Sequence, residues 1–292
     1  MHYTKKDKNL LRINRVIVII LVLVILFPLL YILLASFLEP GILLTSGIFG
    51  FGLSDFTFDG YIRVLQNERM IRGFINSFVY SSVFAFFTVT LTVLTAYPLS
   101  IKGFVGKKVV MTFFLITMFL NGGLIPTFLL IRNLGMLNTI WAIVLPGSLG
   151  VFNIILTKTF FQGIPGDLAA AAQIDGASHF QVFIKIILPL SKPILFVLAL
   201  FAFVGQWNSF FSAMIYLDDP SMQPLQIVLR SILIQNEIQP GMIGDQQAMI
   251  ELNRVAQMIQ YSTIVISSLP LLIMYPFFQK YFEKGMMVGS IK

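Results

Sequence analysis

Residues 165–193 decide how the chain must be organised, and they read Pro165-Gly-Asp-Leu-Ala-Ala-Ala-Ala-Gln-Ile-Asp-Gly-Ala-Ser-His-Phe-Gln-Val-Phe-Ile-Lys-Ile-Ile-Leu-Pro-Leu-Ser-Lys-Pro193. Long apolar runs flank this comparatively polar stretch on both sides, which predicts that it lies on a membrane surface. Pro165 breaks the incoming helix, and Asp167 is positioned to cap a new one. Gly176 suits a sharp turn with positive φ. The stretch therefore predicts two short helices joined by a turn.

The second limb of this predicted helix–turn–helix has one apolar face. That face consists of four residues at helical spacing, Phe180, Phe183, Ile184 and Ile187. Pro189 and Pro193 end the limb and admit the next membrane span. The first limb is small and rich in alanine.

The residues of this stretch resemble the EAA loop of ABC-importer permeases. The matching positions are Ala171, Ala172, Gln173, Ile174, Asp175, Gly176, Ala177, Phe183, Leu188, Pro189, Leu190 and Pro193. In that family the loop is a coupling helix that seats in a groove of a separate ATPase subunit. The resemblance implies a set of ATPase-coupling residues here: Asp167, Ala169, Ala170, Ala171, Ala172, Asp175, Gly176, Ala177, Phe180, Phe183 and Pro189.

One position departs from the family pattern. The glutamate that gives the loop its name would fall at position 170, and this sequence has Ala170. In the family that carboxylate can pair with a basic residue of the ATPase, a contact that alanine cannot make. We expect docking to rest instead on shape and apolar contact along Ala169, Ala172, Ile174 and Phe180. The alternative is an amphipathic interfacial helix with no partner.

Composition excludes a soluble domain. The 292 residues are 57% apolar and 11% charged, with a mean hydropathy of +0.86. A net charge of +7 would fit nucleic acid, but the charges lie in tails and loops between apolar runs, so we expect no nucleic-acid partner. Without cysteine, and with two histidines, no disulfide, thiolate site or histidine-based metal site is expected. No phosphate-binding loop motif occurs, so we expect this chain to bind no cofactor.

Apolar runs along the chain predict an all-α integral membrane protein with six transmembrane helices. We expect a basic tail over 1–15, a first span over 16–38, an external loop over 39–72, a permease core over 73–282 and a tail over 283–292. Within the core, the expected spans are 74–99, 109–131, 139–161, 194–217 and 262–281, with the loop at 163–193 and an external segment at 218–261. The first span has about 23 apolar residues, longer than the core of a cleaved signal.

Basic residues are divided unevenly between the two sides of this map. All twelve lysines, with Arg12 and Arg15, fall in the N-terminal tail, the 100–108 loop, the 158–193 region or the C-terminus. The other six arginines lie in the opposite loops, with nine of the thirteen acidic residues. By the positive-inside rule the lysine side is cytoplasmic. Both termini and the 163–193 loop are therefore expected inside, as six spans require.

No ionisable residue lies near the middle of any predicted span. Proton- and ion-coupled carriers usually need such residues, so a secondary transporter is disfavoured, although sodium sites built from carbonyls stay open. A membrane-embedded enzyme is also disfavoured, because no span carries an acid–base pair or a cluster of metal ligands.

Two polar stretches interrupt the predicted spans. Asn121-Gly122-Gly123 loosens the third span, and Gln206-Trp207-Asn208 lies at the centre of the fifth. Polar groups at membrane depth must face protein or water, so both stretches are candidates for the substrate path. Amides hydrogen-bond hydroxyls, and an indole face packs on the C–H face of a sugar ring. Packing between helices is the alternative that the sequence leaves open.

Two longer stretches are similar to the carbohydrate-uptake branch of the permease family. They are Phe203-Val-Gly-Gln-Trp-Asn-Ser-Phe-Phe211 and Asn121-Gly-Gly-Leu-Ile-Pro-Thr-Phe-Leu-Leu-Ile-Arg-Asn-Leu-Gly-Met-Leu-Asn138, the second resembling Gram-positive permeases for oligosaccharides and polysaccharide fragments. The resemblance implies a non-catalytic subunit in the bacterial plasma membrane. It also implies a second permease subunit in a heterodimer, two ATPase subunits that hold ATP and Mg, and an external sugar-binding lipoprotein. Import of another polar solute and a non-transporting membrane scaffold remain the alternatives.

Overall fold

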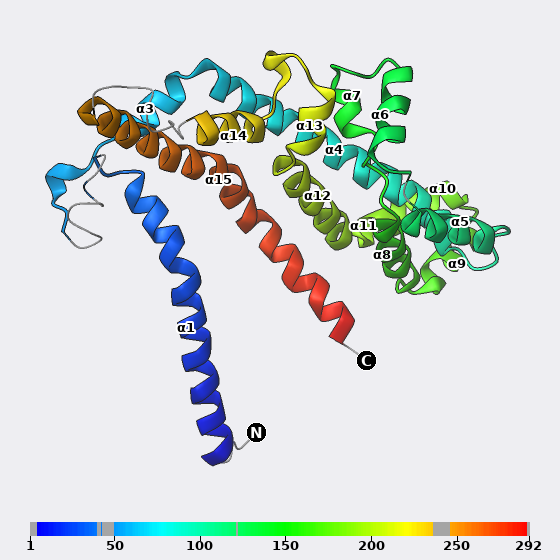
Figure 1. The fold of residues 1–292 in the computed structure, drawn as a ribbon. Helices are drawn as coiled ribbons and strands as arrows, with labels where there is room; N and C mark the ends of the chain where they lie inside the picture. The colour runs from blue at the N-terminus through cyan, green and yellow to red at the C-terminus, as the bar shows by residue number, and fades with distance from the viewer. Residues whose placement is uncertain (1–4, 40–41, 43–49, 121, 236–245, 291–292) are drawn as a thin grey trace. The chain divides into compact units, whose positions relative to one another are not determined.

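The computed structural model describes residues 5–39, 42, 50–120, 122–235 and 246–290. Within these residues the backbone is helical apart from turns, loops and one isolated antiparallel bridge between Leu38 and Phe56 (Figure 1). The predicted all-α class is therefore confirmed. The chain divides into two compact units, one of residues 1–71 and 229–269 and the other of residues 72–228 and 270–292.

The first unit contains α1 (Lys5–Ala35), the 3-10 turn η1 (Leu53–Asp55), α3 (Asp59–Gln66) and the early part of α15 (Gln246–Ser290). Ser36, just after α1, shares a 2.6 Å hydrogen bond with the Tyr61 hydroxyl on α3. The hydroxyl of Ser262 on α15 donates to the Ser36 carbonyl at 3.3 Å. Gly60 makes this approach possible, because a Cβ there would collide with Ser262. The end of α1 is thus fastened to both α3 and α15.

The remaining helices lie in the second unit, apart from residues 229–235 of α14, which belong to the first; the second unit also contains the end of α15. These remaining helices are α4 (Glu68–Ser100), which begins in the first unit, α5 (Lys107–Phe119), α6 (Leu124–Asn133), α7 (Ile140–Val144), α8 (Val151–Gln162), α9 (Gly166–Ile174), α10 (His179–Val182), the π-helical turn η2 (Phe183–Ile187), α11 (Leu188–Leu190), α12 (Lys192–Trp207), α13 (Phe211–Tyr216), the 3-10 turn η3 (Pro220–Met222) and α14 (Leu225–Gln235). The main core of the second unit joins the end of α4 to α8 and to the α10–η2 segment. The buried residues of this core are Val93, Ala96, Leu99, Ile154, Phe161, Val182, Phe183 and Ile187.

Among the residues that the structure describes, three helical stretches are long and apolar enough to cross a membrane: Asn9–Ala35, Glu68–Ser100 and Arg254–Pro276. Two bent pairs raise the number to as many as five if each pair is one span. In the first, α5 and α6 meet at 114°, and in the second the α10–α11 segment meets α12 at 76°. The count of six spans therefore stays a prediction.

The predicted fifth and sixth spans differ from the helices observed. The fifth, expected over 194–217, is interrupted, since α12 ends at Trp207 and α13 begins only at Phe211. The side-chain amide of Asn208 donates to the Val204 carbonyl at 3.0 Å. The Asn208 N–H also donates to this carbonyl at 3.1 Å, whereas the Ser209 N–H donates to the Gln206 carbonyl, so the α-helical ladder ends here. At the sixth, α15 begins at Gln246, well before the predicted start at residue 262.

Candidate functional site

The predicted helix–turn–helix at 163–193 is present, and its turn is a Schellman motif at Gly176. Gly176 has the expected positive φ, +85°. Its N–H donates to the Gln173 carbonyl at 3.0 Å, and the Ala177 N–H donates to the Ala172 carbonyl at 2.9 Å. These two bonds satisfy carbonyls that the end of α9 would leave unpaired. Asp175 is the C-cap residue just before this turn.

The start of α10 is fixed by a capping box that the sequence analysis did not identify. The Gln181 N–H donates to the Ser178 hydroxyl at 3.3 Å, and the Ser178 N–H donates to the Gln181 side-chain oxygen at 2.8 Å. The signal was present, because Ser-x-x-Gln ahead of an apolar run is typical of this cap. Gln173 Nε2 also lies 3.2 Å from His179 Nδ1, across the turn. The two limbs therefore hold a defined angle without help from a partner.

The prediction that Asp167 caps α9 is wrong. The helix begins at Gly166, and its N-cap is Pro165, with φ −53° and ψ 120°. Asp167 lies one residue inside the helix, in its first turn. Pro165 can stand outside the helix because it has no N–H to satisfy there. A carboxylate in the first turn still favours the helix through the dipole.

The two faces of α9 have different environments. Ala169 and Ala172 are half-buried and pack against the core of the second unit, as does Ala177 after the turn. The exposed residues include Ala170, Ala171 and Ile174, the last with 87% of its surface accessible, and also Asp167, Leu168 and Gln173. Ala169 and Ala172, both expected on the docking surface, therefore also contact their own chain, and the docking surface itself stays a prediction. Position 170, where the family pattern has glutamate, faces outward.

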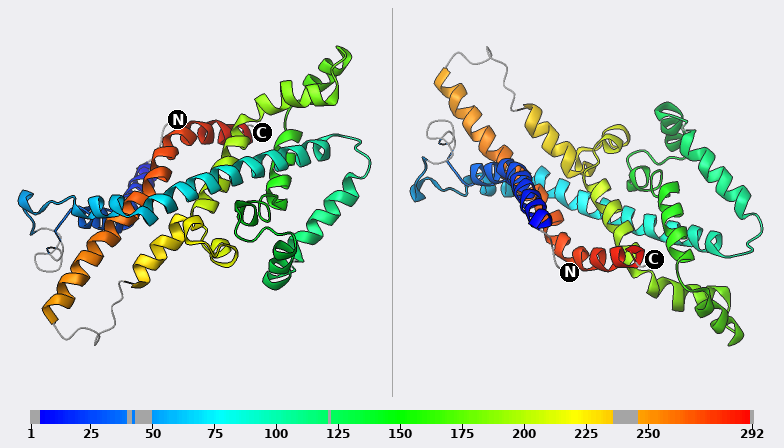
Figure 2. Two further views of the ribbon diagram at one scale, coloured as in Figure 1. Left: turned by 90° about the horizontal axis from the view of Figure 1, so that it is seen from above. Right: turned by 90° about the horizontal axis from the view of Figure 1, so that it is seen from below.

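The predicted apolar face of the second limb is also divided. Phe183 and Ile187 are buried in the core, whereas Phe180 is 64% exposed and Ile184 is exposed as well. The limb passes from α10 into the π-helical turn η2, whose wider turn changes the spacing that the pattern assumed. It then continues through α11, which contains the exposed Pro189, before the bend into α12. In both views of Figure 2 the α9–α10 segment projects at the edge of the second unit.

Tyr97, near the end of α4, anchors the second limb. Its hydroxyl donates to the His179 carbonyl at 2.9 Å. Its ring stacks on Phe183, with ring centres 4.6 Å apart and planes 29° apart. Sequence reasoning missed Tyr97, because nothing in an apolar span distinguishes a tyrosine that contacts a loop from one that packs. A long helix is thus joined directly to the projecting segment.

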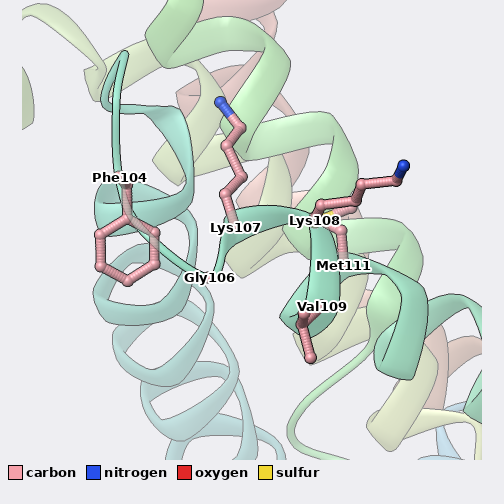
Figure 3. A pocket seen from close by; sticks show the side chains of 6 residues that line it. All are labelled: Phe104, Gly106, Lys107, Lys108, Val109 and Met111. Carbon is pink, nitrogen blue, oxygen red and sulfur yellow. The ribbon is translucent and has the colours of Figure 1, made fainter.

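Basic residues also lie where α4 is followed by α5. Lys102 lies in the loop between α4 and α5, and Lys107 and Lys108 are the first two residues of α5. A pocket of about 550 Å³ there is lined by Phe104, Gly106, Lys107, Lys108, Val109 and Met111. Figure 3 shows the two lysine side chains extending in different directions. The two ammonium groups therefore do not point at one position where a single anion could bind both.

The residues predicted for the substrate path lie in different settings. Asn121 is outside the described residues, whereas Gly122 and Gly123 are exposed at the break between α5 and α6. At the end of α12, Gln206 is partly exposed and Asn208 is exposed. Gly123 borders α13 rather than Gln206 or Asn208, through a cleft that it shares with Phe211.

Trp207, also predicted for the substrate path, is 1% exposed. Its ring packs edge-on against Phe74 at 5.4 Å and stacks on Phe203 at 5.9 Å, measured between ring centres. In this structure the indole therefore packs between helices, which is the alternative left open by the sequence.

The chain belongs to the family described as "Binding-protein-dependent transport system inner membrane component", which matches residues 88–288. It is therefore a membrane permease of the ABC-importer type. As such it is a non-catalytic subunit, and ATP hydrolysis belongs to a separate ATPase.

Individual relatives agree with this assignment. Protein LplC of Bacillus subtilis is 40% identical over 271 residues, which cover 91% of this chain and 88% of the relative. The polygalacturonan/rhamnogalacturonan transport system permease protein YtcP of the same organism is 37% identical, over 81% of this chain and 82% of the relative. A chain in the crystal structure of a bacterial ABC transporter that imports the acidic polysaccharide alginate matches with a TM-score of 0.85 and 29% identity. That match covers 97% of this chain and 99% of the other.

Proposed function

We propose that this permease imports sugars, as oligosaccharides or polysaccharide fragments. The support is that relatives named for polygalacturonan/rhamnogalacturonan transport and for alginate import match it along most of its length. The absence of ionisable residues from the middle of the predicted spans is compatible with a hydroxyl-bearing solute. The energy for import comes from ATP, held with Mg on the separate ATPase subunits.

The coupling element of this transporter is the segment 163–193. The observation that carries this assignment is its geometry, since the Schellman turn and the capping box fix an exposed surface that Tyr97 ties to a long helix. ATP binding closes the two ATPase subunits and displaces this surface, and α4 and α12 move with it. Coupling contacts come from Ala170, Ala171, Ile174 and Phe180, which face outward.

The proposed topology has six spans with both termini in the cytoplasm. It rests on the division of charge, with all twelve lysines on the side of the coupling segment. The proposed partners are a second permease subunit, two ATPase subunits and an external sugar-binding lipoprotein. Gly122, Gly123, Gln206 and Asn208 are retained as residues of the substrate path.

Reconstitution tests the function. Vesicles would contain this chain with its second permease and ATPase, and receive the binding protein with oligosaccharides outside. We expect sugar to accumulate inside and to stimulate ATP hydrolysis. A scaffold subunit would give neither result, and a permease for another solute would respond only to that solute. Loss of both signals when this chain alone is omitted is the necessary control.

A further inference from the structure

A small cleft lies where two broken helices meet in the second unit. It is lined from one side by the start of α6 and from the other by α13, at Gly123, Leu124, Thr127, Phe211, Ser212, Ile215 and Tyr216. Its volume is about 230 Å³. Both flanking helices begin just after an interruption of the helical ladder, so backbone groups are loosened close to the cleft.

Two hydroxyl groups in the cleft can bind a polar ligand. The Thr127 hydroxyl donates to the Gly123 carbonyl at 2.8 Å, which leaves its oxygen free to accept. The Ser212 hydroxyl has no hydrogen-bond partner among the residues that the structure describes, so it can both donate and accept. A ligand hydroxyl can therefore accept from Ser212 and donate to either oxygen.

Two aromatic residues, Phe211 and Tyr216, form the apolar part of the lining together with Leu124 and Ile215. Phe211 presents a ring that is half exposed. Tyr216 is buried, and its ring lies nearly parallel to Phe128, with planes 17° apart and centres 6.3 Å apart. The Asn138 N–H also donates to the Tyr216 carbonyl at 2.9 Å. Hydroxyls beside an accessible aromatic ring such as that of Phe211 suit a ligand ring that carries both hydroxyl groups and C–H faces.

The charge of its lining and its volume limit which ligands the cleft can bind. The residues that line the cleft include no charged side chain within the described part of the chain, so nothing there balances a carboxylate. The volume is below the roughly 300 to 1,000 Å³ of pockets that enclose a drug-sized ligand. We propose that this cleft binds a single neutral sugar unit of the transported chain, a statement that rests on the proposed function. Thr127 and Ser212 make its hydrogen bonds, and Phe211 packs against its ring.

Removal of the hydroxyls tests the cleft. Ser212→Ala and Thr127→Val would be measured for uptake in the full transporter with maltotriose, galactotriose, arabinotriose and trigalacturonate. For any sugar that the wild type imports, each variant should raise the half-saturating concentration about two- to tenfold, as expected for one lost hydrogen bond. Thr117→Val is the matched control, because the Thr117 hydroxyl also bonds its own helix, to the Phe114 carbonyl at 2.8 Å, but does not line the cleft.

Charged replacements test the neutrality of the bound unit. Ser212→Asp and Ser212→Lys should impair uptake alike, since either charge would be left unpaired against a neutral sugar. Uptake that Ser212→Lys preserves and Ser212→Asp abolishes would show an anionic unit and overturn the proposal. If uptake were unchanged in Ser212→Ala and Thr127→Val, the cleft would not be a sugar-binding site, whereas the proposed import of sugars would be unaffected. A wild type that imports none of the four sugars would instead count against the proposed function.

Discussion

The hydroxyl of Tyr97 on α4 donates a 2.9 Å hydrogen bond to the carbonyl of His179 at the start of α10. This bond joins residues 82 positions apart in the sequence. It fixes the second limb of the coupling segment to a helix of 33 residues that is long enough to cross a membrane. Displacement of the segment must therefore move the end of α4 or break this bond.

Tyr97→Phe keeps the ring on Phe183 and removes only the hydrogen bond. We expect a loss of stability of up to about 1 kcal/mol and a several-fold fall in sugar moved per ATP hydrolysed. Tyr97→Ala also removes the stacking and should lower the melting temperature more. Tyr275→Phe is the control, because Tyr275 is exposed. Equal coupling ratios in Tyr97→Phe and the wild type would show that the bond transmits no motion.

Gly176→Val should abolish transport while the permease still inserts in the membrane. A β-branched residue at φ +85° is strained by about 1–3 kcal/mol, so the Schellman turn would open and the coupling surface would lose its shape. Gly166→Ala is the matched control, since a Cβ there meets no atom within 4 Å. Uptake assays beside membrane-fraction blots make the comparison, and normal uptake by Gly176→Val would refute the role of the turn.

Ala170→Glu and Ala172→Glu should separate the outer face of α9 from the inner face. Ala170 points outward, where an added carboxylate at a wet surface contributes only about 0–1 kcal/mol, so uptake should stay within a few-fold of wild type. Ala172 packs against its own core, where a buried charge should unseat the helix and abolish coupling. Uptake and ATP hydrolysis on the same preparation measure both effects. Equal loss in the two variants would contradict the division of faces.

Single cysteines test the topology, because the natural chain contains none. Lys102→Cys and Asp219→Cys place thiols at two exposed positions. An impermeant maleimide applied to intact cells should label only the cysteine at 219, and inside-out vesicles should reverse the pattern. Labelling of both positions from outside would remove the basis for the six-span arrangement.

Trp207→Ala should act first on stability. Truncation of a buried aromatic residue costs about 3–5 kcal/mol, and this one contacts Phe74 and Phe203. We expect a lower complex yield and melting temperature, with uptake falling in step. Asn208→Ala is the comparison, since its exposed side chain bonds only its own helix among the described residues. If Trp207→Ala reduced uptake while the yield of the complex stayed at the wild-type level, the indole would belong to the substrate path.

The sequence was sufficient to predict local structure wherever a residue has one dominant conformational preference. Gly176 between two apolar limbs predicted the turn, which the structure shows with φ +85°. Long apolar runs likewise predicted the helices. In each of these places local chemistry decides the outcome, and tertiary contacts agree with it.

Sequence reasoning failed where orientation decides the role of a residue. In an almost wholly apolar helix such as α12, no contrast between faces shows that Trp207 points inward. Ala169 and Ala170 are chemically identical, yet one contacts the core and the other is exposed. The function of Tyr97 depends on a residue 82 positions away, which no local pattern can reveal.

The alanines of α9 have a thermodynamic consequence. An alanine has no rotamer freedom to lose on binding, whereas a long side chain fixed at an interface costs about 0.5–1.5 kcal/mol in entropy. Ala170 and Ala171 therefore offer a surface that is already ordered before a partner arrives, within a turn whose backbone is held at both ends. Weak contacts suffice to hold such a surface.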